Sequence, residues 1–278
     1  MDRPIGMFDS GFGGLTVARA LIDLMPGEDV VYLGDTARKP YGSRPQEEVR
    51  EFAREIAWSL VRDYGVKAVV VACNTASAAA LDVLRAELPV PVIDVIQPGT
   101  EALVRATQNG RAGVICTVGT HSSGAYEKAV ATTGFDVQLT NVACPGLVEF
   151  VERGQTEGEE VHILVERLLA PVIDADVDAL LLGCTHYPYL ARVISDVMGR
   201  GVTLVSSADE TATATLIRLG ELDLLDRSDD RAVHRFLSSG DSAWFVDLGG
   251  RLLGPELTDA ELWVPSAKPA QPPIQQGR

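Results

Sequence analysis

Two cysteines follow apolar runs that have the composition of buried strands. In the stretch LLLGCTHYP, Cys184 comes after three leucines and a glycine and is followed by Thr185 and His186. In the stretch VVVACNTAS, Cys73 follows a similar run and precedes an asparagine and a threonine. In open α/β sheets, ligands bind beyond the carboxyl ends of the strands. The two cysteines are therefore candidate reactive residues.

A pair of opposed thiols suggests acid/base chemistry at a carbon atom. If one thiolate removes a proton and a thiol on the opposite face returns one, the stereocentre inverts. Lowering a thiol pKa from about 8.5 to about 7 takes roughly 2 kcal/mol, whereas a helix N-terminus supplies about 0.3 to 1 and at most about 2 kcal/mol. Each thiol therefore needs a side-chain partner. His186 is the candidate for Cys184, and Asp9, at the end of the first expected strand, is the candidate for Cys73.

The residues beside the cysteines also suit the starts of helices. Asn74, Thr75 and Thr185 are each good caps for the helix that is expected to follow. Caps at these positions would place each sulfur near a helix N-terminus, where the thiolate form is favoured. We therefore expect the backbone to contribute to the reactivity of both thiols.

Three other interpretations of these residues account for less of the pattern. Free cysteine is among the most buried residue types, so a single one at a strand end would be packing filler. Zinc binding would need CxxC or HxxxH spacing, which the sequence lacks. A Cys–His nucleophile for hydrolysis or amide transfer would use Cys184 and leave Cys73 without a role.

The glycine-rich stretch FDSGFGG matches a nucleotide-binding turn only in part. A GxGxxG motif would need glycine where Thr16 stands, and the GxxxxGK[ST] pattern is absent. We expect instead a tight turn that exposes Asp9 and Ser10 to a cleft and leaves backbone N–H groups free for a carboxylate. Asp9 would then be placed to bind a substrate ammonium group.

Hydroxyl-bearing and small residues recur at the expected strand ends. Each alone is more often a cap or a turn residue. Together, such neutral donors could hold a small carboxylate without an arginine. The candidates are Ser10, Tyr41, Gly42, Thr75, Thr117, Thr120 and Thr185.

Short β-branched runs alternate with helical patterns along most of the chain. Continuous apolar strands, each followed by a helix, predict parallel sheets covered on both faces. The clearest helix is expected at 45–64, where apolar residues recur at helical spacing and Pro45 suits the first turn. The expected strands are 5–8, 30–33, 68–72, 92–95, 113–117, 137–142, 179–182 and 202–205.

These elements predict an α/β fold of two similar lobes. Each lobe would be a mostly parallel sheet flanked by helices, with the active site in the cleft between them. Residues 1–96 would form the first lobe and 97–206 the second, and 207–265 would return to the first. The Pro-rich segment 266–278 has almost no apolar bulk and is expected to be a disordered tail.

The composition limits the partners and the compartment. The chain of 278 residues carries 24 basic and 39 acidic residues, and its net charge of −15 argues against direct contact with nucleic acid or anionic membranes. The N-terminus lacks the features of a signal peptide, and no apolar run approaches the ~18 residues of a membrane span. The four cysteines are therefore expected to be reduced thiols in a cytoplasmic protein.

Six motifs together resemble the glutamate racemases, a cofactor-independent group within the aspartate/glutamate racemase superfamily. The resemblance covers the chain up to about residue 265. It implies two α/β lobes with the active site between them, and a homodimer. The motifs are FDSGFGG (8–14), PYG (40–42), ACNTAS (72–77), TVGT (117–120), ACPGLVEFVERG (143–154) and GCTHYP (183–188).

The resemblance also assigns roles to individual residues. Cys73 and Cys184 are implied to act on opposite faces of the α-carbon of glutamate, assisted by Asp9 and His186, which also count among the substrate-binding residues. Glu152 matches a carboxylate of the family near the cleft. The remaining residues that the resemblance assigns to the substrate are Ser10, Tyr41, Gly42, Asn74, Thr75, Thr117, Thr120 and Thr185.

The implied reaction is the interconversion of L- and D-glutamate, without a cofactor or metal, to supply D-glutamate for peptidoglycan and thus for cell wall and cell shape. The GCTH sequence, in place of GCTE, favours glutamate over aspartate. Cys116 stands where the family more often has glycine, and it is expected to be buried filler near Thr117. Alternatives are a racemase of aspartate or a hydantoin, and a non-catalytic regulatory protein that binds small acids. Because some racemases of this family have been linked to inhibition of DNA gyrase, gyrase is a candidate protein partner.

Overall fold

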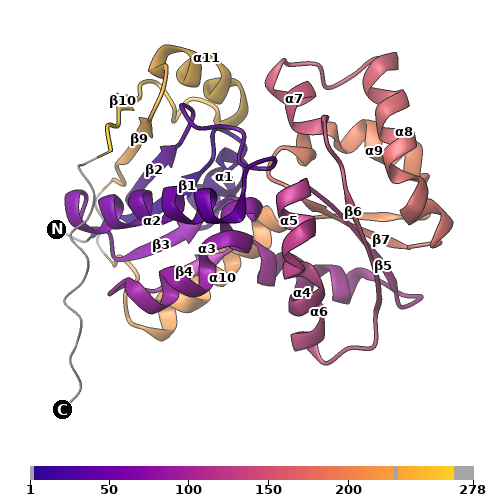
Figure 1. Ribbon diagram of the computed structural model, residues 1–278. Helices are drawn as coiled ribbons and strands as arrows, with labels where there is room; N and C mark the ends of the chain where they lie inside the picture. Colours follow the sequence, from indigo (N-terminus) through magenta and orange to yellow (C-terminus); the bar gives the residue numbers. More distant parts are fainter. Residues whose placement is uncertain (1–2, 228–230, 266–278) are drawn as a thin grey trace.

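The computed structural model describes residues 3–227 and 231–265 and contains two parallel β-sheets, each surrounded by helices (Figure 1). The tail expected at 266–278 lies outside these residues. All eight expected strands are present, and their ends differ from the expectation by at most two residues. The α/β class with two parallel sheets is therefore confirmed.

The first sheet has the strand order β10-β9-β2-β1-β3-β4, and every neighbouring pair is parallel. Its central strands are buried along their whole length, as the continuous apolar runs predicted. Strands β9 and β10 were not predicted from the sequence, because the first has only two apolar residues and the second is two residues long. The strands are β1 (Ile5–Asp9), β2 (Val30–Gly34), β3 (Ala68–Val71), β4 (Val92–Asp94), β9 (His234–Ser238) and β10 (Glu261–Leu262).

The second sheet has the order β6-β5-β7-β8 and is also parallel throughout. The central strand β7 carries the three leucines that precede Cys184, and all of its residues are buried. The strands are β5 (Arg111–Cys116), β6 (Gln138–Ala143), β7 (Ala179–Gly183) and β8 (Thr203–Ser206).

Helices follow most of the strands, as βαβ connections require. The expected helix at 45–64 is α2 (Gln46–Asp63), with Pro45 and Tyr64 as its flanking caps. The other helices of the first lobe are α1 (Leu15–Leu24), α3 (Asn74–Glu87), α10 (Ser207–Glu221) and α11 (Ser242–Leu253). Those beside the second sheet are α4 (Ile96–Ala106), α5 (Val118–Ser123), α6 (Ala125–Thr133), α7 (Leu147–Glu152), α8 (Glu159–Asp174), the 3₁₀ helix η1 (Tyr187–Leu190) and α9 (Ala191–Met198).

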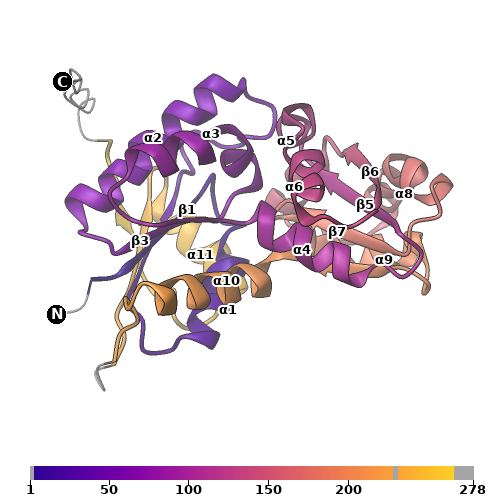
Figure 2. The ribbon, with the colours of Figure 1, turned by 90° about the horizontal axis from the view of Figure 1, so that it is seen from below.

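The chain crosses between the two sheets twice. It leaves the first sheet after β4 through α4 and returns after β8 through α10, and these two helices pack against each other (Figure 2). One apolar cluster continues from α1 and β1 into α8 and α9, so the two lobes share part of their core. In this arrangement the carboxyl ends of β3 in the first sheet and β7 in the second both lie at the seam between the lobes.

Candidate active site

A narrow cavity lies at the seam, and loops from both sheets close around it. Cys73, which follows β3, and Cys184, which follows β7, both line it. Only about 20 Å³ is open to the centres of water molecules, which is room for about one water. A larger ligand therefore requires the lobes to separate. The other lining residues are Ser10, Pro40, Tyr41, Gly42, Asn74, Thr75, Thr117, Val148, Thr185 and His186.

Cys73 is itself the N-cap of α3. Its Sγ accepts a hydrogen bond from the backbone N–H of Ala76 at 3.4 Å, so neither Asn74 nor Thr75 caps this helix, contrary to the expectation from sequence. Despite this contact with the helix N-terminus, burial and, to a smaller extent, the nearby Asp9 charge raise the pKa of the Cys73 thiol to about 12. The unliganded site therefore holds a neutral thiol here, because desolvation outweighs the helix dipole.

Asp9 is fully buried directly behind the cavity wall rather than in it. The backbone N–H of Gly11 donates to its Oδ2 at 3.0 Å, and the N–H groups of Ser10 and Gly14 and the thiol of Cys73 also bond to the carboxylate. The expectation that these N–H groups would be free for a ligand is therefore wrong, because they solvate Asp9. Burial outweighs these hydrogen bonds and raises the pKa of Asp9 to about 6.

His186 lies beside the second thiol. Its Nδ1 is 3.9 Å from the Sγ of Cys184, and burial raises the pKa of that thiol well above its ordinary value. Burial, together with the charge of Lys39, lowers the pKa of His186 to about 3, so the imidazole is neutral near pH 7. A neutral ring with its proton on Nε2 leaves Nδ1 free to accept a proton from the thiol.

Thr185 joins the two halves of the site instead of capping a helix. A 3₁₀ helix follows it, and its N-cap is His186, so the expected cap role of Thr185 is also wrong. The Thr185 hydroxyl instead donates to Oδ1 of Asp9 at 3.4 Å. A residue after β7 thus contacts the carboxylate that lies beside the other cysteine, so the surroundings of the two thiols are linked across the seam.

Glu152 approaches the site from α7. Its Oε1 is 3.8 Å from Nε2 of His186, and its Oε2 is 3.2 Å from Nζ of Lys39. Lys39 also lies 3.7 Å from the ring centroid of Trp244, a cation–π contact with α11. Neither Lys39 nor Trp244 was predicted from the sequence to be a site residue. The position of Lys39 directly before the PYG motif was the only signal available.

Three threonine hydroxyls form a cluster at the cavity. The Oγ1 atom of Thr117 lies 3.0 Å from that of Thr75 and 3.0 Å from that of Thr120, and the Oγ1 atoms of Thr75 and Thr120 are 3.3 Å apart. Thr75 and Thr117 line the cavity, whereas Thr120 is fully buried behind them. Because hydroxyl groups can turn to donate to a ligand, the cluster is suited to an anionic group.

Asn74 makes a second connection across the seam. Its Nδ2 donates to the hydroxyl of Tyr126 at 2.8 Å, and its Oδ1 has no hydrogen-bond partner although it is buried. Tyr126 lies on α6 and gave no sequence signal. An unpartnered buried amide oxygen that lines a cavity is a group to which a ligand donor could bond.

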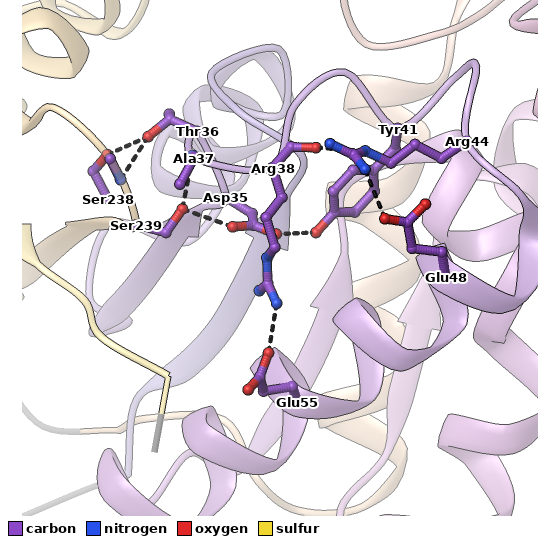
Figure 3. A network of polar contacts seen from close by, with 11 residues as sticks. Asp35, Thr36, Ala37, Arg38, Tyr41, Arg44, Glu48, Glu55, Ser238 and Ser239 are labelled. Carbon is purple, nitrogen blue, oxygen red and sulfur yellow. Dashed lines mark hydrogen bonds and ion pairs between the residues drawn. The ribbon is translucent and has the colours of Figure 1, made fainter. Parts of the chain in front are cut away.

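Tyr41 lines the cavity, but its hydroxyl does not point into it. The hydroxyl donates to the carboxylate of Asp35 (Figure 3), and the ring lies 5.7 Å from that of Phe52 on α2. Gly42 comes close to the second lobe, since its carbonyl accepts from the N–H of Gly119 at 2.8 Å. The Tyr41 hydroxyl is therefore held by Asp35 inside the first lobe, while the Gly42 backbone contacts the second lobe.

Within residues 3–227 and 231–265, no cluster of three or more His, Cys, Asp or Glu side chains is arranged to hold a metal ion. Over the same ranges no helix has both the length and the apolar character needed to cross a bilayer. Cys116 is fully buried in the second lobe with its Sγ 3.2 Å from Oδ1 of Asn141, and it does not line the cavity.

Comparison with known proteins agrees with this geometry. The family model described as Asp/Glu/Hydantoin racemase matches residues 15–215. The chain is 53% identical over 270 residues to a glutamate racemase of Parafrankia sp., covering 96% of both chains. A crystal structure of a glutamate racemase from Bacillus anthracis has a TM-score of 0.89 at 40% identity and covers 94% of this chain and 97% of its own. The glutamate racemase of Francisella tularensis, solved with D-glutamate, has a TM-score of 0.88 at 32% identity, covering 95% and 98%.

Proposed function

The chain belongs to the Asp/Glu/hydantoin racemase family, and on this premise we propose that it interconverts L- and D-glutamate with Cys73 and Cys184 as the two acid/base groups. The observation that carries the proposal is that these cysteines come from different lobes and line one cavity. Placed on opposite sides of a bound Cα, one sulfur would remove the proton and the other would replace it.

The two thiols must differ in protonation when the substrate is bound. Without substrate the proton stays on each sulfur, because the pKa values of both thiols lie above those of their neighbours, Asp9 and His186. The substrate ammonium group would stabilise a thiolate, and Asp9 beside Cys73 or His186 beside Cys184 would then take the thiol proton. The resulting thiolate removes the proton from Cα, and the opposite thiol donates its own proton to the carbanion. The product has inverted configuration, and the thiol and thiolate have exchanged places. Return of the proton through the helper residues restores the starting state.

Binding of the substrate relies on neutral donors. Among the described residues that line the cavity none is Arg or Lys, so the carboxylates of glutamate would bond to hydroxyl, amide and backbone N–H groups. Ser10, Asn74 and Thr185 line the cavity together with the two cysteines. Thr75 and Thr117 also line it, and their hydroxyl oxygens are 3.0 Å apart. The substrate ammonium group would offset the charge of Asp9 and of the thiolate.

Cys73→Ser and Cys184→Ser test the assignment. A serine hydroxyl is too weak an acid to replace either thiol, so each variant should lose at least about 100-fold in kcat for both enantiomers. In deuterated water the wild-type product should carry deuterium at Cα. The control is Cys116→Ser, in which the hydroxyl can still bond to Asn141 and which should keep kcat within about threefold.

Either cysteine variant with wild-type turnover would overturn the two-thiol assignment. A panel with aspartate and a hydantoin tests the substrate, because turnover of these in preference to glutamate would replace the proposed activity with another of the family. Dialysis against EDTA should leave turnover unchanged if neither a metal nor another cofactor takes part. Binding of glutamate without turnover by the wild-type protein would favour the regulatory alternative.

We further propose that the protein acts as a cytoplasmic homodimer whose D-glutamate is used for peptidoglycan. Depleting the protein from its host should then stop growth and distort cell shape, and added D-glutamate should restore both. Light scattering of the purified protein reports the oligomeric state. A monomer in solution, or growth without D-glutamate after depletion, would contradict this part of the proposal.

A further inference from the structure

A fully buried carboxylate, that of Asp35, lies behind the loop of residues 36–45, which joins β2 to α2 and contributes to the cavity wall. Asp35 directly follows β2, and its side chain is 0% exposed. Its Oδ2 accepts from the Tyr41 hydroxyl and from Nε of Arg38 at 2.7 Å, and its Oδ1 accepts from the Ser239 hydroxyl at 2.6 Å (Figure 3). All three donors belong to the first lobe, and of these three residues Tyr41 alone lines the cavity.

The partners of Asp35 anchor it to three different elements. Ser239 follows β9, and Arg38 continues the network to Glu55 on α2, where Nη1 lies 2.5 Å from Oε2. The backbone N–H of Asp35 donates to the carbonyl of Asp9 at 3.0 Å. The carboxylate is therefore fixed to the rigid sheet and to α2, while Tyr41 belongs to the loop that it holds.

The loop in turn makes the contact between the lobes. Pro40, Tyr41 and Gly42 line the cavity, and the Gly42 carbonyl accepts from Gly119 across the seam. There is no spare room at this contact, since a Cβ on Gly42 would lie 2.8 Å from the Thr117 side chain. A small shift of the loop would therefore change both the cavity wall and the closure of the lobes.

We propose that Asp35 is a positioning residue for substrate binding, and that it acts by tethering the Tyr41 hydroxyl so that Gly42 is held against the second lobe. This inference rests on the proposed function and adds to it a residue that touches neither the substrate nor the thiols. Tyr41 is then an anchor of the loop, and its phenol is not a substrate ligand. A substrate that needs the closed loop binds only the fraction of molecules in which the tether is made.

The tether should affect binding much more than chemistry. If loss of the tether leaves the loop correctly placed in about a tenth of the molecules, the apparent Kd and KM for glutamate rise about tenfold. Once the substrate is bound the loop is closed, so kcat should stay within about threefold of wild type. A defect confined to folding would lower the amount of active protein and kcat while leaving KM unchanged.

Three variants test this tether: Asp35→Asn, Tyr41→Phe and the double variant. Asparagine keeps the size of Asp35 but presents an N–H₂ group to the donors, and phenylalanine keeps the ring on Phe52 without the hydroxyl. The measurements are KM and kcat in both directions, and the Kd of D-glutamate by calorimetry. Tyr41→Phe is the milder change, and it keeps the inference testable if Asp35→Asn does not fold.

A double-mutant cycle separates the tether from a general loss of stability. Each single variant should raise KM and Kd about tenfold, and the double variant should be no worse than Asp35→Asn alone, because both act on one hydrogen bond. Glu48→Gln is the matched control, since it removes an ion pair of the same loop region, with Arg44, on the surface (Figure 3). It should leave both constants within about twofold.

The readouts distinguish this inference from the proposed function. A wild-type protein that binds D-glutamate but does not racemise it would refute the proposed function. The effect of the variants on the Kd of D-glutamate would still show whether Asp35 positions the loop. Unchanged KM and Kd in Tyr41→Phe would overturn the inference. So would fully additive effects in the double variant, or a fall in kcat with KM unchanged.

Discussion

The carboxylate of Asp9 should destabilise the folded protein at neutral pH, and Asp9→Asn should remove this effect. Asp9 is fully buried, and burial raises its pKa from 3.8 to about 6, against hydrogen bonds from Gly14, Gly11, Cys73 and Ser10. Each unit of pKa shift corresponds to about 1.4 kcal/mol, so a shift of roughly two units is worth about 3 kcal/mol. This unfavourable charge lies beside Cys73, the thiol that must lose a proton in the proposed mechanism.

The sign of the effect follows from proton binding. Between about pH 4 and pH 6 the folded state holds the Asp9 proton more tightly than the unfolded chain does, so the free energy of unfolding falls as the pH rises through this window. Above about pH 6 the full penalty of about 3 kcal/mol is present. Asparagine carries no charge at any pH, so the variant lacks this dependence.

The assay is urea unfolding of both proteins, followed by tryptophan fluorescence at several values from about pH 4 to about pH 7.5. The stability of Asp9→Asn relative to wild type should increase by about 2 to 3 kcal/mol across this range, while its kcat falls about 100-fold. The control is Asp136→Asn at an exposed position, for which the difference should stay within about 0.5 kcal/mol. A difference for Asp9→Asn that does not vary with pH would refute the reasoning.

Two further predictions concern close packing and a buried charge. A Cβ on Gly13 would lie 2.6 Å from Nδ1 of His186, so Gly13→Ala should displace the imidazole and lower kcat roughly 100-fold. The control is Gly27→Ala, which should keep its kcat because no atom lies near the added Cβ. Normal turnover of Gly13→Ala would contradict this prediction. Lys67 and Glu28 form an ion pair of 2.6 Å with side chains 5% and 4% exposed, so Lys67→Met should leave an unpaired buried charge and lower the free energy of unfolding by roughly 3 to 5 kcal/mol. A loss below about 1 kcal/mol in urea unfolding would show that the carboxylate finds another partner.

Structural features that depend on residues close together in the sequence were predicted correctly. The eight expected strands are present, and those with continuous apolar runs, such as β1, β3 and β7, are buried central strands of sheets covered on both faces. The positions of Cys73 and Cys184 after two such strands predicted a common site, since ligands bind beyond the carboxyl ends of parallel strands and the two sheets were expected to face one cleft. The short strands β9 and β10 were missed because their few apolar residues give no detectable alternation.

Properties that depend on burial or on distant partners were not predictable in this way. Proximity to a helix N-terminus suggested a favoured thiolate at Cys73, but the surrounding protein removes water and the pKa rises instead. Nothing in the sequence indicated that the Tyr41 hydroxyl bonds to Asp35, which is in turn held by Ser239, a residue about 200 positions away. The contact of Lys39 with Glu152 likewise joins segments that only folding brings together.

The sequence by itself determined the order of the strands along the chain, the class of the fold and the residues able to exchange protons. These follow from hydrophobic periodicity and side-chain chemistry, which are local properties. The tertiary structure decided which groups are charged, which N–H groups are already bonded and which side chains face the cavity. Those depend on how much water each group loses and on what packs against it, and both are set only when segments distant in sequence come together.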